Sequence, residues 1–526
     1  MSAPGKVHLS ETVACLALAT DLGMGQPLEH GLRTCLLAVR VGEALGLSQA
    51  EIADAYYICL LRFVGCNAHA HQDALETGDE IAFRSGIAPF LNGGTPEILR
   101  FMVGNLGRGA PVMHRARMVA GALAAGPKGG REPIATTCEV ARMIASRLDM
   151  SPGVVRGLDY TYEHHDGSGF PNGAAAEEIP VAAHVAMVAR DFEILYRLGG
   201  WDMVLEVAKK RRGRAYNPRV LDGFVAHALG QLEAEASETG WDAVMAADPS
   251  PVVLSGTRLT EALTCCADFA DISSPFTLGY SHQVSDLAAR AAGALRLDSG
   301  RIELVRCAAL VQELGMSAVS RAVVDKAGPL TDGEWERVRL HPYFTERILV
   351  RCPGLAPIGT LAGSHHERMD GSGYHRGTAA DRLPPTARLL AAAGAYVAIT
   401  SGRPWRPAIP AGEAATTLGE LVSSGAFEGE AVDAVLAAAG EPASPRRRRA
   451  RPAGLTEREV EVLRLISRGM SNRQVAGDLM ISVKTVGRHV ENIYTKAGVS
   501  TRAAAAMFAL QNGLAEPEPF AGQEQD

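Results

Sequence analysis

The segment from Leu455 to Leu514 constrains the fold most, because its local signals all agree on short capped helices. Thr456 and Glu459 form an S/T-x-x-E capping box, which supplies hydrogen-bond partners to the free amides at a helix start. Apolar residues then recur at helical spacing until Gly469, and Ser471 is placed to cap a second helix. A short turn leads to a third helix, so the segment is predicted to form a helix-turn-helix unit.

The third expected helix has one apolar and one polar side. Val486, Val490 and Ile493 form the apolar side, which we expect to be buried. The other side presents a basic, amide-bearing stripe that suits the DNA major groove. We expect Lys484 and Arg488 to contact bases and the other predicted residues to contact phosphates or base edges. The residues predicted to contact DNA are Lys484, Arg488, Thr485, Asn492 and Arg473.

These residues resemble the LuxR-type (NarL/FixJ) four-helix DNA-binding domain. The resemblance rests on the LTxRExEVL start, the S-x-x-TV-x-x-H step and the later Lys496 and Arg502. It implies that the third helix enters the major groove of double-stranded DNA and that the fourth, at about Thr501 to Gln511, serves dimerisation. The expected protein partners are a second copy, giving a homodimer, and RNA polymerase. Gly487 and Glu491 depart from the pattern, since relatives often carry basic groups there.

The length of 526 residues exceeds the usual size of one domain, so two or three domains are expected. A hydrophobic fraction of 47% can fill buried cores, and abundant alanine with only 5% aromatic residues favours closely packed helices. No apolar run approaches a membrane span, and the N-terminus has no basic-then-apolar export signal. The nine cysteines are scattered without a C-x-x-C pair, as in a reducing compartment. We therefore expect an all-α, cytoplasmic protein that does not contact membranes.

Charge is distributed unevenly along the chain, whose formal net charge is −7. Residues 443–452 hold five arginines between prolines and no acid, as expected for a linker, whereas residues 516–526 form an acidic tail. The basic region therefore points to nucleic-acid contact near the C-terminus and not along the acidic body. The DNA-binding domain is expected at 453–515.

The body contains an internal repeat, in which EHHDGSGFPNG (Glu163 to Gly173) recurs as ERMDGSGYHRG (Glu367 to Gly377). Both copies lie among segments with helical periodicity and resemble the HD-GYP branch of the HD phosphohydrolase superfamily, an all-helical fold. Active members hydrolyse cyclic di-GMP or related phosphoesters at two or three divalent metals, held by imidazoles and bridged by an aspartate. The resemblance implies two degenerate HD-GYP-like helical domains, at 1–250 and 251–442.

The second copy keeps part of the metal-ligand set that the resemblance implies. The retained histidines are His341, His365 and His366. The replaced positions are Tyr280 for the first histidine, Gln312 and Glu313 for the His-Asp pair, and Gly394 for the closing aspartate. The three histidines, with Glu313 as a fourth ligand, either hold a single Zn²⁺ or Fe²⁺ or remain as relics that make hydrogen bonds. A third reading is a pocket that binds a small nucleotide ligand without cleaving it.

The first copy keeps less of the set. Only His30 fits its position, and the other six positions hold Arg62, Phe63, Thr137, Thr161, Tyr162 and Arg190. The spacing supports this register, because 161 − 137 and 365 − 341 are both 24. Arginine repels a dication and phenylalanine offers it no lone pair, so we expect no metal here. The basic run Lys209 to Arg214 is expected to form a solvated face, with contact to an anion as the alternative.

Together these patterns predict a DNA-binding transcription regulator whose degenerate HD-GYP-like body senses a ligand or dimerises. No catalytic residue and no required cofactor is expected, apart from the single divalent metal that the second copy can hold. The main alternative is a metal-dependent phosphohydrolase, acting on cyclic di-GMP or another phosphoester, with a DNA-binding appendage. A scaffold that recruits a protein partner is the third interpretation.

Overall fold

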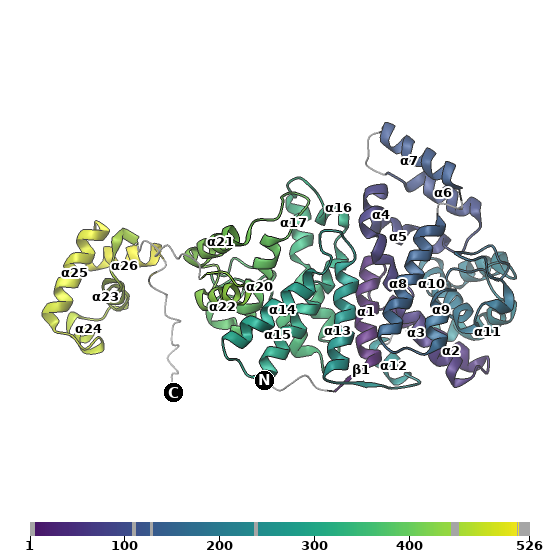
Figure 1. Ribbon diagram of the computed structural model, residues 1–526, viewed down its shortest axis with the longest axis horizontal. Coiled ribbons are helices and arrows are strands. Elements are labelled where there is room, and N and C mark those ends of the chain that lie inside the picture. The colour runs from purple at the N-terminus through teal and green to yellow at the C-terminus, as the bar shows by residue number, and fades with distance from the viewer. Residues whose placement is uncertain are drawn as a thin grey trace, which may run out of the picture. The chain divides into compact units, whose positions relative to one another are not determined.

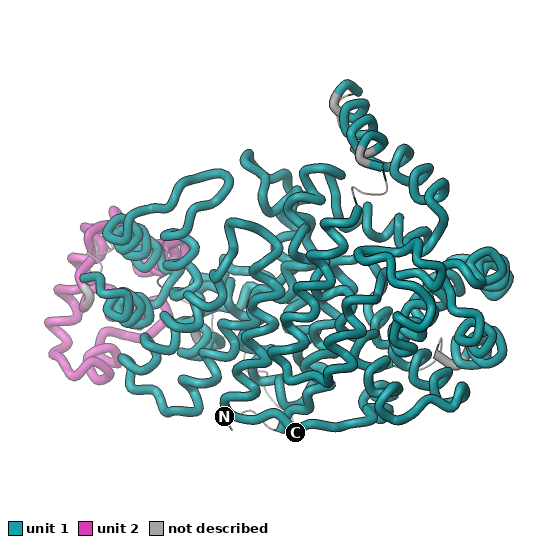
Figure 2. Tube along the Cα trace, turned by 45° about the vertical axis from the view of Figure 1, so that its right-hand side comes forward, with its two compact units in different colours: residues 1–445 teal, residues 446–526 magenta. Residues whose placement is uncertain are grey.

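The computed structural model describes residues 6–107, 112–126, 130–235, 240–442, 452–512 and 514. The chain divides into two compact units, residues 1–445 and residues 446–526 (Figure 2). The predicted acidic tail and residues 443–451 of the predicted linker lie outside the described residues. In the described ranges the strands are limited to β1 (Val7–His8) and β2 (Val253–Leu254), and all other regular elements are helices. The predicted all-α fold is confirmed.

Unit 1 contains two similar series of helices. The first series opens with α1 (Leu9–Gly23), α2 (His30–Ala44) and α3 (Gln49–Leu61). The second opens with α13 (Thr257–Asp271), α14 (Tyr280–Ala294) and α15 (Ser299–Val311). Matched helices have the same lengths of 15, 15 and 13 residues, which shows that the sequence repeat is also a structural one.

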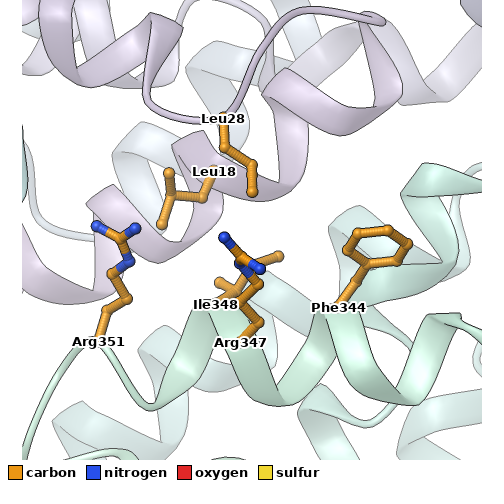
Figure 3. A pocket seen from close by; sticks show the side chains of 6 residues that line it. All are labelled: Leu18, Leu28, Phe344, Arg347, Ile348 and Arg351. Atoms are coloured by element: carbon orange, nitrogen blue, oxygen red, sulfur yellow. The ribbon is translucent and has the colours of Figure 1, made fainter. Parts of the chain in front are cut away.

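The two copies share one apolar core. β1 and β2, each placed before the first helix of its copy, pair antiparallel, with Val7 opposite Leu254. Helix α1 packs against α13 at the middle of the body (Figure 1). The close-up in Figure 3 shows a second part of this seam, where Leu18 and Leu28 face Phe344 and Ile348, and the cavity between them measures about 10 Å³. That volume holds one water molecule at most, so the two copies are closely packed at this point.

The remaining helices of the first copy surround α1–α3. They are η1 (Val64–His69), α4 (Ala70–Thr77), α5 (Glu80–Ile87), η2 (Ala88–Phe90), α6 (Thr95–Asn105), α7 (Val112–Ala125), α8 (Arg131–Arg147), α9 (Pro152–Leu158), η4 (Ala176–Glu178), α10 (Val181–Arg211), α11 (Pro218–Glu235) and α12 (Gly240–Ala246). Those of the second copy are η5 (Leu314–Ala318), α16 (Arg321–Val324), α17 (Asp332–Arg339), α18 (His341–Leu349), α19 (Ala356–Ala362), η6 (Ala380–Arg382), α20 (Pro385–Thr400), α21 (Ala411–Ser424) and α22 (Gly429–Ala439).

The first copy is longer than the second in one region. The last residues of α3 and α15, Leu61 and Val311, are 250 positions apart, whereas Pro152 and Ala356, which begin α9 and α19, are 204 apart. The first copy therefore has 250 − 204 = 46 additional residues, in the stretch that contains α4–α7. Helices α6 and α7 extend away from the rest of the body (Figure 1), and α6 has no buried side chain.

Two glycines fix the same close approach in both copies. A Cβ added at Gly65 would lie 1.9 Å from the carbonyl oxygen of Thr137, and one at Gly315 would lie 2.1 Å from that of His341. Only glycine permits backbones to approach this closely. Since Gly65 and Gly315 lie in η1 and η5, the structure pairs Thr137 with His341, as the sequence spacing predicts.

Unit 2 is a bundle of α23 (Glu457–Ser467), α24 (Asn472–Asp478), α25 (Val483–Ala497) and α26 (Arg502–Gln511). The predicted capping box is present, because Thr456 Oγ1 accepts from the Glu459 amide and Glu459 Oε2 accepts from the Thr456 amide. Ser471 caps α24 in the same way. The prediction that Val486, Val490 and Ile493 are buried is also confirmed.

Candidate metal centre and nucleic-acid interface

The second copy gathers the four predicted metal ligands at one point. Glu313 precedes η5, His341 begins α18, and His365 and His366 follow α19. One ligand atom from each residue lies within 4.8 Å of the ligand atoms of the other three. His341 is fully buried and His365 is 5% exposed, so their rings reach a place that is shielded from solvent.

Backbone carbonyls fix the orientation of the two buried imidazoles. Nδ1 of His341 lies 2.7 Å from the Val338 carbonyl oxygen, and Nδ1 of His365 lies 2.7 Å from that of Ala362. A carbonyl only accepts, so both rings carry a proton on Nδ1, and in the neutral form of each ring Nε2 is unprotonated. These two Nε2 atoms are 3.0 Å apart. Facing lone pairs repel at this distance, so the arrangement is suited to a cation held between them.

The carboxylate of Glu313 completes the cluster. It lies 3.4 Å from His365 Nε2 and 3.8 Å from His341 Nε2. Burial would raise the pKa of Glu313, but contact with His365 and the nearby charges of His341 and Arg403 lower it to about 2. Burial lowers the pKa of His341 to about 4. At neutral pH the cluster therefore offers an ionised carboxylate and a neutral imidazole, the forms that bind metals.

The remaining positions of the family's ligand set hold groups that do not suit a second metal ion. The Tyr280 hydroxyl donates to the Gly394 carbonyl at 3.2 Å, and the Arg403 guanidinium lies 5.1 Å from the Tyr280 ring. Gln312 is fully buried, and neither atom of its amide has a hydrogen-bond partner among the described residues. The donor set fits one divalent ion and does not fit a carboxylate-bridged pair.

One side chain at this centre was not predicted from the sequence. The ring of Tyr374 stacks on His366, with centroids 4.5 Å apart and an angle of 23° between the planes. Tyr374 directly follows the repeated DGSG motif, but spacing alone does not reveal which imidazole it covers. The stacking helps to fix the orientation of the His366 ring within the cluster.

In the first copy, two arginines occupy the equivalent centre. Arg62 is the C-cap of α3, as Gln312 is of α15. Arg190 lies ten positions after the N-cap of α10 (190 − 180), as Gly394 does in α20 (394 − 384). Both arginines are 1% exposed. The places of the three histidines hold the buried side chains of Thr137, Thr161 and Tyr162.

The carboxylate of Asp191 contacts several buried polar side chains at this centre. Asp191 lies 2.6 Å from both Arg190 and Arg211, accepts from the Tyr216 hydroxyl at 2.5 Å, and accepts from the Asn92 amide at 3.0 Å. Burial would raise the pKa of Asp191, but the two arginines lower it. The expectation that Lys209 to Arg214 form a solvated face is wrong for Arg211, which is 6% exposed because it pairs with this carboxylate.

His30, the one residue of the first copy that fits the family pattern, is also committed elsewhere. Its Nδ1 lies 2.5 Å from Glu193, which Arg33 contacts at 3.2 Å. Burial would raise the pKa of Glu193, but His30 and the neighbouring arginines lower it to about 2. The first copy thus offers guanidinium groups and a paired imidazole where a metal would need free ligands.

In unit 2, all five residues predicted to contact DNA are exposed: Lys484, Thr485, Arg488, Asn492 and Arg473. The first four lie on α25, whose start is capped by Ser482 accepting from the Thr485 amide at 3.1 Å. Glu491 is exposed on the same helix. Their contacts with DNA stay a prediction.

Two basic residues of the motif instead hold unit 2 together. Lys496 Nζ lies 2.7 Å from Glu459, whose side chain is 3% exposed. Arg502 donates to the Asn472 side chain at 3.2 Å and to the Met470 carbonyl. These contacts link α23 to α25 and α24 to α26, a role that the motif alone does not distinguish from DNA contact.

Comparisons with known proteins agree with both parts of this description. The model of the HD domain family matches residues 131–208 and 264–429, and that of the bacterial regulatory proteins, luxR family, matches residues 453–509. The 3′3′-cGAMP-specific phosphodiesterase 3 of Vibrio cholerae is 30% identical over 434 residues, covering 78% of this chain and 90% of that protein. A crystal structure of a cyclic GMP-AMP specific phosphodiesterase from V. cholerae has a TM-score of 0.58 and 27% identity, covering 83% of this chain and 98% of that one.

The C-terminal part is also similar to the response regulator protein VraR of Staphylococcus aureus, at 47% identity over 60 residues, which are 11% of this chain and 29% of that protein. The chain belongs to the HD domain family, within its HD-GYP phosphodiesterase-like branch. It carries in addition a LuxR-type DNA-binding domain at its C-terminal end. Among the helices that the structure describes, none has the length and apolar character to cross a membrane.

Proposed function

We propose that this protein is a sequence-specific transcription regulator whose HD-GYP-like body is a ligand sensor and not a phosphodiesterase. The observation that carries the proposal is the contrast between its two functional parts. The DNA-binding unit has its caps, its core and an exposed basic stripe. The second copy of the body retains one cluster of metal ligands, with Gln312 and Gly394 at positions where a bridged metal pair needs further ligands.

The ligand proposed for the body is a cyclic dinucleotide. The support is the similarity to a 3′3′-cGAMP-specific phosphodiesterase over 78% of the chain. A single divalent ion on the cluster of Glu313, His341, His365 and His366 would supply a Lewis acid for phosphate oxygens. The histidine rings would hold the ion. The positive charge of Arg403 helps to keep Glu313 ionised, because it lowers the pKa of that carboxyl group. The body would then bind the phosphodiester without the second ion that activates water in bridged centres.

DNA binding is proposed to require a dimer of the chain. One helix-turn-helix unit covers a single half-site, and tight specific binding generally needs two. We propose that ligand binding by the body changes how two units reach adjacent half-sites, with RNA polymerase as the partner at the promoter. The proposed footprint contains two half-sites with centres about 10–10.5 base pairs apart, or a multiple of that spacing.

The experiment combines footprinting of the full chain with a ligand titration. Genomic sites are identified first, and the affinity for one site is then measured with and without 3′3′-cGAMP. Arg488→Ala should weaken specific binding by about 5- to 150-fold, because a base contact contributes about 1–3 kcal/mol. Arg212→Ala removes the same charge from an exposed position in unit 1 and should leave the affinity unchanged. Equal footprints for wild type and Arg488→Ala would refute the assignment of α25 as the recognition helix.

A second candidate function is hydrolysis of a cyclic dinucleotide by a mononuclear centre. The facing Nε2 atoms of His341 and His365, with Glu313 beside them, favour it. Turnover of 3′3′-cGAMP by purified protein, together with loss of turnover in His365→Ala, would establish this activity and displace the sensor proposal. Binding without turnover would support the sensor.

A further inference from the structure

The centre of the first copy contains more positive charge than its acids balance. Arg62, Arg190 and Arg211 are 1%, 1% and 6% exposed. Asp191 pairs with Arg190 and Arg211, whereas Nη1 of Arg62 donates to the Ala186 carbonyl at 3.1 Å. A buried charge that lacks a counter-charge is costly, so the region favours an additional negative group.

Unused hydrogen-bond donors lie in the same region. Among the described residues, nothing accepts from Nε and Nη2 of Arg62 or from Nε of Arg190, and Nε2 of His30 also lacks a partner. Nearly all buried polar groups in folded proteins have a partner, in protein, water or a bound ion. Guanidinium donors are the groups that bind anions best, because they are always charged and are fixed in a plane.

The guanidinium groups of Arg62 and Arg190 lie close to the same aromatic ring. Their central carbons lie 4.7 Å and 5.9 Å from the same ring, that of Phe63. Burial lowers the pKa of Arg62, and the charge of Arg190 lowers it further, as expected for neighbouring cations. The positions correspond to Gln312 and Gly394, so cationic side chains replace the part of the site where the family places metal ligands. The centre of the first copy is therefore positively charged, whereas the corresponding centre of the family holds groups that bind cations.

The additional segment of the first copy closes this centre. Asn92, which follows η2, donates to Asp191 at 3.0 Å, and the carbonyl of Pro89 accepts from Arg211 at 2.8 Å. The side chains around Arg62 and Arg190 are therefore shielded from solvent. A group that fits among them must be small.

We propose that the first copy binds a small inorganic anion, phosphate or chloride, between Arg62 and Arg190. The anion would accept from the unused guanidinium donors and would balance the charge of Arg62. This site is separate from the metal cluster of the second copy and does not depend on the function proposed for it. The anion would either be a permanent structural component of the first copy or a ligand whose binding the regulator senses.

The test is thermal unfolding of the full chain in sodium phosphate, sodium chloride and sodium gluconate at equal ionic strength. We expect a saturable rise in the melting temperature of roughly 2–4 °C in phosphate or in chloride, relative to gluconate, whose anion is too large for the closed site. The stronger of the two effects identifies the anion. Arg62→Met should lose the rise, whereas Arg212→Met, which removes an exposed arginine, should keep it.

Phosphate also stabilises proteins without binding, so the comparison of variants decides the result. An equal rise in all three proteins, or no saturable rise in the wild type, would overturn the proposal. If Arg62→Met does not fold, crystals of the wild type soaked in bromide or phosphate replace it. Density within hydrogen-bond distance of Arg62 and Arg190 supports the site, and its absence under both conditions refutes it.

Discussion

The two copies in the body have the same helices and opposite chemistry at their centres. In the second copy, Glu313 and three imidazoles meet at one point. In the first, Phe63 and two buried arginines occupy the corresponding place. The helix lengths and the close-contact glycines are nevertheless shared. The scaffold is therefore maintained by backbone packing, and the ligand residues can change independently of it.

The largest effect should come from the shared glycines. Gly65→Ala and Gly315→Ala place a Cβ within about 2 Å of a backbone carbonyl, at 1.9 Å and 2.1 Å. Neither backbone can move without shifting a helix, so each change should cost at least about 4 kcal/mol or prevent folding. Gly230→Ala, where a Cβ meets no atom within 4 Å, is the control and should be tolerated. Normal stability of one glycine variant and not the other would show that the copies do not share this packing.

The second-largest effect should be on metal binding, which we expect to differ between the centres of the two copies. His365→Ala should lower the affinity for Zn²⁺ or Mn²⁺ by roughly a hundredfold or more, because it removes a ligand that faces His341 at 3.0 Å. Thr161→Ala, the matched change in the first copy, should leave the metal content unchanged. Metal titration of both variants by calorimetry measures this. Equal losses would mean that the bound metal is not at the second copy's cluster.

Prediction from sequence worked well where helix signals and spacing were sufficient. The capping box of Thr456 and Glu459 and the buried face of α25 follow from local patterns. The equivalence of Thr137 and His341 follows from equal spacing, and the structure supports it through Gly65 and Gly315. These features could be predicted because each is set by the order and spacing of residues along the chain.

Contacts between distant segments could not be predicted in the same way. Lys496 was recognised as part of a motif, but its pairing with Glu459 depends on how α23 meets α25. Arg211 lies within a basic run that looks solvated, yet it pairs with the buried Asp191 from the same bent helix, α10. Charge in sequence does not show which member of a run turns inward.

A smaller effect should appear in the stability of the first copy at low pH. Glu193 has a pKa of about 2 in the folded state, below its ordinary value, so its stabilising contribution is present above about pH 4.5 and is lost as the pH falls toward 2. Glu193→Gln should therefore destabilise by roughly 2 kcal/mol at pH 7 and by clearly less at pH 3.5.

Denaturant unfolding of both proteins at the two pH values measures this change. Glu206→Gln alters an exposed acid on the same helix and should have little effect at either pH. A destabilisation by Glu193→Gln that is the same at pH 7 and pH 3.5 would contradict the ion-pair account. The second copy has Val397 at the matching position (193 + 204), so the effect belongs to the first copy.

The smallest effect concerns metal binding by the first copy, which we expect to remain absent even after a histidine is introduced. In a His365→Ala background, Thr161→His places an imidazole in the first copy at the position that His365 holds in the second. Metal should still not bind, because Arg62 and Arg190 repel a dication and Phe63 offers no ligand atom. Elemental analysis of the double variant tests this. One metal ion per chain would show that the arginines do not determine the difference between the copies.

The most direct test of the account is the metal content of the full chain, measured with turnover in excess Mn²⁺ or Fe²⁺. The account predicts at most one metal ion per chain, located at His341 and His365, and no hydrolysis of 3′3′-cGAMP or cyclic di-GMP. Two metal ions per chain with hydrolysis of either dinucleotide would contradict it.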